Sequence, residues 1–357
     1  MRRVVATAPV RVCDVGGWTD TWFGSPGQVC SVAVGPGVEV VASLVEAEQP
    51  VRLIAPALGE DYFVGPSDDA DVGWMLPLPG RQALLEHAIA EVVGNHTTAR
   101  DRSIEVTINS SVPPGASLGT SAAVLVALLG ALEALLVDTS QHRDPAALAR
   151  LAHSVETGRA GREAGVQDQW AAAMGGCLFL AVGPYPEVRA ERLDVPSAAL
   201  AALGGRLVTV VFGPHDSSAV HGEVSHALLS CDGPEHHRSR DALRRLASLA
   251  RDAADALVAG DIDRWAGVLV ESTSAQATLH PGLVGPDHAA AIQVARACGA
   301  SGWKVNGAGG AGGSLTMVAG PGGATALRDA LASADPTWQI VDLRPSGGLE
   351  VRVDTGP

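Results

Sequence analysis

The chain has 357 residues, of which 46% are hydrophobic and 18% are charged, so it can bury a large core and is long enough for two domains. Its formal net charge is −14, which leaves no basic face to neutralise a phosphate backbone. The composition therefore argues against a nucleic-acid partner. Small phosphorylated ligands stay open, because a few local donors suffice to bind them.

The cysteines indicate a reducing compartment. Five of them are widely spaced without a CxxC pair, namely Cys13, Cys30, Cys177, Cys231 and Cys298. Buried free thiols in a reducing cytoplasm are the usual state of such residues. The sequence has neither a charged-then-apolar leader nor an apolar run that looks lipid-spanning. We expect a soluble cytoplasmic protein, a monomer or homodimer, without a membrane partner.

The first stretch, residues 3–14, reads as a strand that Pro9 interrupts, which indicates an edge or bulged position. Arg11 within it must find an anion or an acceptor if it is buried. A structural carboxylate and a ligand site are equally good candidates for that partner. The following turn contains Asp20, which could present its carboxylate to polar ligand groups or form an ordinary Asx-turn.

Two further strands are expected at residues 29–45 and 51–64, followed by an amphipathic helix at residues 84–93. Trp74 lies in the loop before that helix. Its ring could stack on a nucleotide base or cover an edge of the core.

A Pro/Gly/Ser loop at residues 112–121 joins an alternating strand, residues 103–108, to a nearly unbroken apolar helix, residues 122–136. Small residues let backbone N–H groups approach a ligand, and a helix start adds unpaired donors and a positive dipole end, which together suit a phosphate. Thr120 and Ser121 stand at the helix entrance. An ordinary turn with a Ser/Thr N-cap is therefore the alternative.

Two acidic residues lie at the ends of the next predicted helices. Asp144 and Pro145 predict the start of a helix that runs to Glu156. Asp168 follows twelve positions later and opens another helix, so the two carboxylates can converge on one pocket. Taken alone, Asp168 reads as a helix-start carboxylate favoured by the dipole.

Residues 183–186, Gly-Pro-Tyr-Pro, read as a hinge between two domains. Beyond them a strand is expected at residues 207–212, with helical segments at residues 221–251, around Trp265 and at residues 289–298. The histidines of this part are too irregularly spaced for a zinc site and fit solvated positions. They are His221, His226, His236 and His237.

A glycine-rich run at residues 307–313 contains G-x-G-x-x-G, the pattern of dinucleotide-binding folds. In those folds the pattern follows a strand and opens a helix, whereas here it leads into a strand at residues 314–318. A glycine hinge that lets the backbone approach a ligand is the better interpretation. Strands at residues 338–343 and 349–353 are expected to complete a β-rich C-terminal unit.

Three stretches, in this order, resemble the motifs of the GHMP kinases, the superfamily of galactokinase and of homoserine, mevalonate and phosphomevalonate kinases. They are residues 8–20, residues 113–123 and residues 304–313. The resemblance spans almost the whole chain and implies a two-domain α+β fold. A ribosomal-protein-S5-like N-terminal domain would occupy residues 1–185 and a ferredoxin-like C-terminal domain residues 186–357. ATP and Mg²⁺ are the implied cofactors.

Within the superfamily, residues 17–21 and 165–176 resemble the branch that holds fucokinase and the D-glycero-D-manno-heptose 7-phosphate kinases, which phosphorylate the anomeric hydroxyl of a sugar. The G-E-H of galactokinases is missing, which argues against galactose. The resemblance predicts an ATP-dependent kinase of a hexose, deoxyhexose, uronic acid, heptose or heptose phosphate. A non-catalytic sugar and nucleotide sensor and a kinase of a non-sugar alcohol are the alternatives.

The resemblance also assigns roles to individual residues. Asp168 would be the general base, and Arg11 would neutralise charge beside it. Ser121 and Glu156 would hold Mg²⁺. The ATP phosphates would lie against Pro114, Gly115, Ser117, Gly119, Thr120, Ser121 and Ala122. The acceptor would contact Asp20, Gly17, Trp18, Thr19, Gly307, Gly309 and Gly310.

Two features depart from the family pattern. Ser117 occupies a position usually held by glycine, and serine tolerates a positive φ poorly, so we expect a differently shaped loop. A sugar phosphate would need a local basic cluster, and Arg159 and Arg162 are the nearest candidates, although both could be surface residues.

Overall fold

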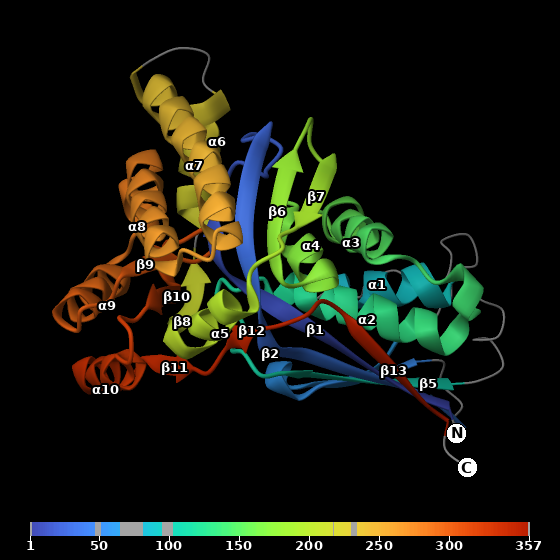
Figure 1. Cartoon of the computed structure of the whole chain (residues 1–357). Coiled ribbons are helices and arrows are strands. Elements are labelled where there is room, and N and C mark those ends of the chain that lie inside the picture. Colours follow the sequence, from blue (N-terminus) through green and yellow to red (C-terminus); the bar gives the residue numbers. More distant parts are fainter. Residues whose placement is uncertain are drawn as a thin grey trace.

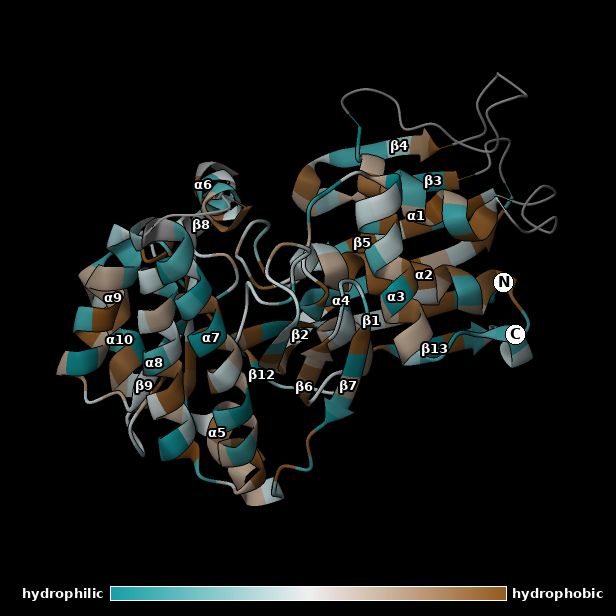
Figure 2. Cartoon of the chain, turned by 90° about the horizontal axis from the view of Figure 1, so that it is seen from above, coloured by the Kyte–Doolittle hydropathy of each residue, from teal (hydrophilic) through white to brown (hydrophobic). Residues whose placement is uncertain are grey.

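The computed structural model describes residues 2–46, 51–64, 81–94, 103–216, 218–229 and 234–355. Trp74, considered above as a stacking residue, lies outside these ranges. The described chain forms two β-sheets, each packed against helices (Figure 1). Seen from above, the two halves lie side by side, with α7 (Pro234–Val258) next to α8 (Ile262–Leu279) where the halves meet (Figure 2).

The first sheet is built mainly from the N-terminal half. Its strand order is β13 (Glu350–Thr355), β1 (Arg2–Val15), β2 (Gly27–Val45), β5 (Ser103–Ser110), β3 (Val51–Ala55) and β4 (Glu60–Val64). Neighbours are antiparallel except for the parallel pair of β3 and β5. Three short strands extend it, because β6 (Cys177–Val182) and β12 (Arg344–Pro345) pair with β2, and β7 (Val188–Arg192) pairs with β6.

Pro9 disturbs β1 as predicted. The register of β1 against β2 shifts between Ala8 and Val10, and β13 pairs only with the part of β1 that precedes Pro9. A proline has no N–H to give to a ladder, so the strand bulges there and its later residues are re-aimed. Beyond the bulge, the backbone N–H of Arg11 donates to the carbonyl of Leu118 at 2.9 Å. This bond ties the strand to the glycine loop.

Residues 51–64 form a hairpin, β3 and β4, where we expected one strand. Pro56 starts a short 3₁₀ turn between them, and Gly59 ends it with a φ of 69°. A left-handed residue of this kind reverses the chain, which explains the difference.

Two helices of this half, α2 (Thr120–Leu136) and α4 (Gln167–Met174), pack on the first sheet, and α1 (Ala83–Val93) and α3 (Pro145–Ser154) pack against them (Figure 1). The central helix α2 is almost entirely buried, in keeping with its apolar sequence. Asp144 caps α3 as predicted, since its carboxylate accepts from the backbone N–H of Ala147 at 2.7 Å. After α3 the chain makes a single π-helical turn, Val155–Arg159, which carries Glu156.

The second sheet is antiparallel, with strand order β11 (Gln339–Val341), β8 (Leu207–Asp216), β10 (Ala311–Val318) and β9 (Gly302–Val305). The helices α9 (Pro286–Ala297) and α10 (Ala324–Ala334) pack on it (Figure 1). The remaining helices of this half are α5 (Ser197–Arg206), α6 (Ser218–Leu229), α7 and α8. The glycine-rich run begins between β9 and β10 and leads into a strand, as expected, although β10 already starts at Ala311, within the run.

Two sequence expectations about the arrangement of the halves are wrong. Residues 183–186 are the turn of the β6–β7 hairpin rather than a hinge, because both strands pair within the first sheet. The second of the closing strands, β13, pairs with β1 in the first sheet, although β11 joins the second sheet as expected. The residues near each position could not predict these differences. A Gly/Pro turn has the same sequence signature in a hinge and in a hairpin, and the partner of β13 lies at the other end of the chain.

The halves are held together by a shared core. One continuous set of buried apolar side chains runs from the first sheet to α7 and α8, and a separate core lies beneath the second sheet. The guanidinium carbon of Arg251 on α7 sits 3.7 Å from the centre of the Phe179 ring on β6. The division at residues 185 and 186 stays a prediction. No helix within the described ranges is both long enough and apolar enough to cross a membrane.

Candidate active site

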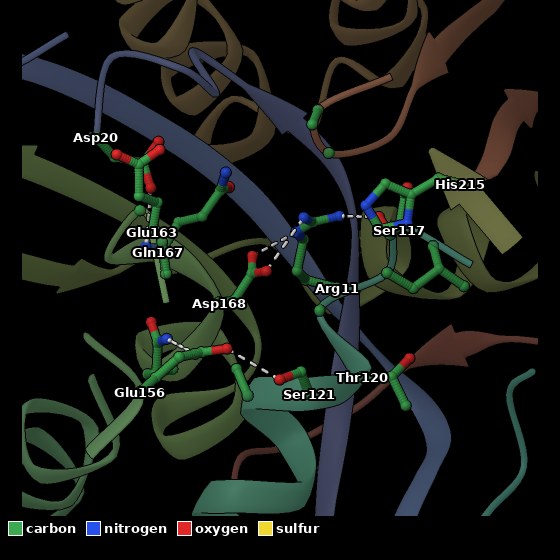
Figure 3. Close-up of a pocket in the computed structure, with 18 of the residues that line it drawn as sticks. Arg11, Asp20, Ser117, Thr120, Ser121, Glu156, Glu163, Gln167, Asp168 and His215 are labelled. Atoms are coloured by element: carbon green, nitrogen blue, oxygen red, sulfur yellow. Dashed lines mark hydrogen bonds and ion pairs between the residues drawn. The ribbon is translucent and has the colours of Figure 1, made fainter. Parts of the chain in front are cut away.

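The candidate site is a cavity of about 320 Å³ where the two halves meet (Figure 3). Its walls come from the end of β1 and the turn after it, the glycine loop and the start of α2, the segment from the π-turn to the start of α4, the end of β8, α6, and the start of the glycine run. It brings together twelve of the residues assigned above, namely Arg11, Trp18, Asp20, Gly115, Ser117, Gly119, Thr120, Ser121, Ala122, Glu156, Asp168 and Gly307.

The centre of the cavity is an ion pair between Arg11 and Asp168 (Figure 3). Arg11 Nε donates to Asp168 Oδ1 at 2.8 Å, and a second nitrogen of the guanidinium lies 3.4 Å from Oδ2. The Arg11 side chain is 5% exposed and that of Asp168 is 28% exposed. The carboxylate therefore faces the cavity while the cation supports it from behind.

Asp14 is a second carboxylate on Arg11 that the sequence argument overlooked. Its Oδ1 lies 3.7 Å from Arg11, and the backbone N–H of Gly307 donates to the same carboxylate at 3.0 Å. Burial alone would lower the pKa of Arg11, but the charges of Asp14 and Asp168 outweigh it and raise that pKa. The carboxylate spaced three residues from Arg11 was a usable signal. Its contact with the glycine run was not, because the two lie 293 positions apart.

The glycine loop presents an open helix start to the cavity. Gly119 is the N-cap of α2, with a φ of 74° and no side-chain cap hydrogen bond. The Ser/Thr N-cap considered above is thus not formed, and Thr120 Oγ1 is buried without a hydrogen-bond partner. Ser117 takes a φ of 57°, a conformation that favours glycine. A helix start without a cap is suited to an anion.

The glycine loop also lies directly on the central ion pair. A Cβ atom added at Gly119 would lie 3.0 Å from Asp168 Cγ. One added at Gly307 would lie 3.1 Å from a terminal nitrogen of Arg11. Both glycines have a positive φ. Close approach of the backbone, as well as its conformation, requires glycine at these two positions.

Glu156 lies at the lower side of the cavity in Figure 3, joined to Ser121. Ser121 Oγ donates to Glu156 Oε1 at 2.9 Å, and the Gln169 side-chain amide donates to Oε2 at 2.7 Å. Burial raises the pKa of Glu156, and these two hydrogen bonds partly oppose that shift. The π-turn places this carboxylate, and such turns are frequent at functional sites.

Asp20 is buried at the opposite end of the cavity from the glycine loop. Its Oδ2 accepts from the backbone N–H of Gln167 at 3.0 Å, a partner 147 positions away, so it does not form an Asx-turn. Burial raises the pKa of Asp20 to about 6. The backbone at Gly165 approaches so closely that an added Cβ would lie 2.2 Å from Asp20 Oδ2.

Five residues assigned by resemblance do not line this cavity: Pro114, Gly17, Thr19, Gly309 and Gly310. Thr19 is engaged within its own turn, because its hydroxyl donates to the carbonyl of Gly16 at 2.7 Å. Gly309 packs against the carbonyl of Leu283, where an added Cβ would lie at 2.2 Å. These positions shape the backbone of the motifs, so a motif match alone could not separate them from lining residues.

Other lining residues were missed. Glu163, Gln167, Thr21, His215 and His221 carry polar groups into the cavity wall. His221 was expected at a solvated position, yet its ring stacks on Trp18 with centroids 5.5 Å apart. Only the packing of α6 over the turn after β1 brings these two together.

Comparison with known proteins places these features in a family. Residues 83–176 match the sequence profile of the GHMP kinases N terminal domain. Mevalonate kinase of Thermococcus sibiricus is 33% identical over 96 residues, which cover 27% of this chain and 28% of that protein. Mevalonate kinase of Pyrococcus furiosus is 29% identical over 210 residues, or 54% of this chain and 56% of that protein. The alignments thus span between about a quarter and about half of these relatives.

Solved structures resemble the whole chain. A D-glycero-D-manno-heptose 1-phosphate kinase from Bacteriodes thetaiotaomicron superimposes with a TM-score of 0.72 at 20% identity, covering 98% of both chains. Lactococcus lactis galactokinase gives a TM-score of 0.72 at 16% identity, with 98% of this chain and 95% of that chain covered. The chain therefore contains a GHMP kinase N-terminal domain and adopts the two-domain α+β fold of GHMP kinases, which confirms its resemblance to this superfamily.

Proposed function

We propose that this protein is an ATP-dependent kinase that transfers the γ-phosphate to a hydroxyl of a sugar. The observation that carries the proposal is the contact between the uncapped start of α2 and the Arg11–Asp168 pair in one cavity. Phosphoryl transfer needs positioning and charge neutralisation more than covalent catalysis. An anion site adjoining a carboxylate that a cation supports meets both needs.

The nucleotide phosphates would lie along the glycine loop. Ser117, Gly119 and Thr120 line this part of the cavity, and the uncapped start of α2 offers its backbone N–H groups there. A Mg²⁺ ion would be held by Ser121 and Glu156, whose oxygens already lie 2.9 Å apart. Within the described residues no group of three or more His, Cys, Asp or Glu side chains could hold a metal. The Ser121 hydroxyl and the Glu156 carboxylate fit Mg²⁺, because this ion takes one or two carboxylates and completes its shell with phosphates and water. When bound, the ion neutralises charge on the phosphates.

Asp168 would take the proton from the acceptor hydroxyl. The acceptor oxygen forms a bond to the γ-phosphorus, the bond from that phosphorus to the ADP oxygen breaks, and the proton passes to the Asp168 carboxylate. Arg11 holds that carboxylate in place through the 2.8 Å bond. Arg11 would also stabilise the negative charge that develops on the γ-phosphoryl group in the transition state.

The acceptor would occupy the end of the cavity that contains Asp20. Asp20 is an acceptor for hydroxyl groups, and Trp18 offers an apolar ring beside it. The similarity of residues 17–21 and 165–176 to fucokinase and heptose kinases supports transfer to the anomeric hydroxyl. A kinase of mevalonate is the second candidate, because the curated relatives named above are mevalonate kinases.

The test is a screen of aldoses, deoxysugars, uronic acids, sugar phosphates and mevalonate with ATP and Mg²⁺, followed by location of the phosphate on the product by NMR. Asp168→Asn is the matched variant. It should lower kcat by about 10³-fold while the Kd for ATP changes less than about threefold. Undiminished turnover in Asp168→Asn would remove that residue as the base. Transfer to mevalonate alone would establish the second candidate.

A further inference from the structure

We infer that the acceptor is an uncharged polyol, and that Glu163 and Asp20 exclude acceptors that carry a phosphate or a carboxylate. This inference rests on the proposed function and narrows its substrate class. It depends on the charges that line the acceptor end of the cavity and on how each is already paired.

The described lining of the cavity contains one arginine or lysine and four carboxylates: Arg11, Asp20, Glu156, Glu163 and Asp168. Glu156 is joined to Ser121 and Asp168 is paired with Arg11. Asp20 and Glu163 are left without an arginine or lysine partner in the described chain. An anionic group placed between them would meet repulsion from both carboxylates, and the basic side chain beside them, His221, already contacts Glu163.

Arg11 cannot serve such an anion without breaking existing contacts. Its guanidinium bonds to Asp168 and to the carbonyl of Ser117 at 2.5 Å, and it lies 3.7 Å from Asp14. Its side chain is 5% exposed. The phosphate that is transferred would already compete for this cation, so a second anion on the acceptor finds none free.

Glu163 is held at the cavity wall by α6. His221 Nδ1 lies 3.2 Å from Glu163 Oε2, and the His221 ring stacks on Trp18. Figure 3 shows Glu163 beside Asp20 and Gln167, at the side of the Arg11–Asp168 pair away from Ser117. The carboxylate, whose side chain is 57% exposed, therefore lies at the solvent-facing rim of the wall where the acceptor would lie.

The neutral groups of this wall suit hydroxyls. Trp18 and Gln167 both line the cavity, and their Nε1 and Oε1 atoms are buried without a hydrogen-bond partner among the described residues. One is a donor and the other an acceptor, and a hydroxyl can satisfy either. A hydroxyl that reached either atom would remove the cost of leaving it unpaired, whereas an ionised carboxylate could accept from Trp18 Nε1 but would have no proton to donate to Gln167 Oε1.

The arginines closest in sequence to this wall lie outside the cavity. Arg159 is paired with Glu91 at 2.7 Å, and its side chain is 62% exposed. Arg162 is exposed, and neither residue lines the cavity. The basic cluster that a sugar phosphate would need is thus not assembled by the described residues.

The experiment compares aldoses and 6-deoxyaldoses with the uronic acid and the 6-phosphate of the same sugar, measuring kcat/KM with ATP and Mg²⁺. We expect the neutral member of each set to exceed the anionic members by at least about 100-fold. The gap should narrow as salt rises, because charge repulsion is screened. Glu163→Lys should reduce the gap by about tenfold or more, and Glu163→Gln by less. Arg162→Ala, outside the cavity, should leave it unchanged.

Each outcome is decisive. Equal or better turnover of a uronic acid or sugar phosphate, lost on Asp168→Asn, would overturn this inference and leave the proposed kinase intact. Loss of such turnover on Arg162→Ala would show that the acceptor charge is bound outside the cavity, which also overturns it. Transfer to no acceptor, with ATP binding intact, would remove the proposed function and the inference with it.

Discussion

Asp20→Asn tests whether a carboxylate at the acceptor end of the cavity is buried at the expense of stability. Burial raises the pKa of Asp20 to about 6, against 3.8 for an unperturbed aspartate. The shift is about two units, and each unit corresponds to about 1.4 kcal/mol, so the ionised form destabilises the folded protein by about 3 kcal/mol. Asparagine has nearly the same shape, can still accept from the Gln167 N–H and carries no charge.

The sign follows from proton binding. Between pH 4 and pH 6 the folded state holds a proton on Asp20 that the unfolded state has lost, so the free energy of unfolding falls as pH rises through this window. The penalty is fully present above about pH 7 and absent below about pH 4. Asp20→Asn should therefore unfold like the parent near pH 4 and be more stable by about 3 kcal/mol at pH 8.

The assay is urea unfolding of both proteins at several pH values, with Asp194→Asn as control because Asp194 is exposed. The quantity compared is the difference in free energy of unfolding between variant and parent at each pH, so the contributions of the other titrating groups cancel. A difference that stays flat between pH 4 and pH 8 would refute the argument from burial. At pH 8 the same variant should raise the KM for the acceptor by about tenfold or more, since it loses a charged acceptor of hydroxyl hydrogen bonds.

Three other changes test the remaining parts of the site. Ser117→Gly should raise the free energy of unfolding by about 1 kcal/mol, because a left-handed serine is strained, whereas Ser117→Ala keeps the strain and should not stabilise. Asp14→Ala should lower the free energy of unfolding by about 3 kcal/mol, because it removes a buried partner of Arg11. Asp14→Asn can still accept from the Gly307 N–H and should lower it by less, so equal losses would contradict a role for the hydrogen bond between Asp14 and Gly307. Glu156→Gln should raise the Mg²⁺ concentration for half-maximal activity by about tenfold, and an unchanged titration would exclude Glu156 as a metal ligand.

The architecture explains why the site lies where it does. The bulge at Pro9 changes the direction of β1, so that Arg11 lies against the glycine loop. The hydrogen bond from the Gly307 N–H to Asp14 connects the glycine run of the second sheet to the same strand. The chain halves share one core through α7 and α8, so these contacts are held by packing rather than by the cavity residues themselves. A site of this kind can leave its helix start uncapped because the surrounding fold supports it.

The sequence alone determined what depends on neighbours along the chain. Alternation and periodicity predicted most strands and helices, Asp144 and Pro145 predicted a cap, and Pro9 predicted a bulge, because each effect acts within a few residues. The motifs predicted which stretches would meet, since their order and spacing are properties of the chain.

Only the tertiary structure decided what depends on residues far apart. In the tertiary structure β13 pairs within the first sheet, residues 183–186 form a hairpin turn, and the Asp14 carboxylate accepts from the backbone N–H of Gly307. It also separated Thr19 and Gly309, which shape backbone, from Glu163 and His221, which line the cavity. The physical reason is that burial, charge and hydrogen-bond partners belong to a position in space, which one residue's own sequence context does not specify.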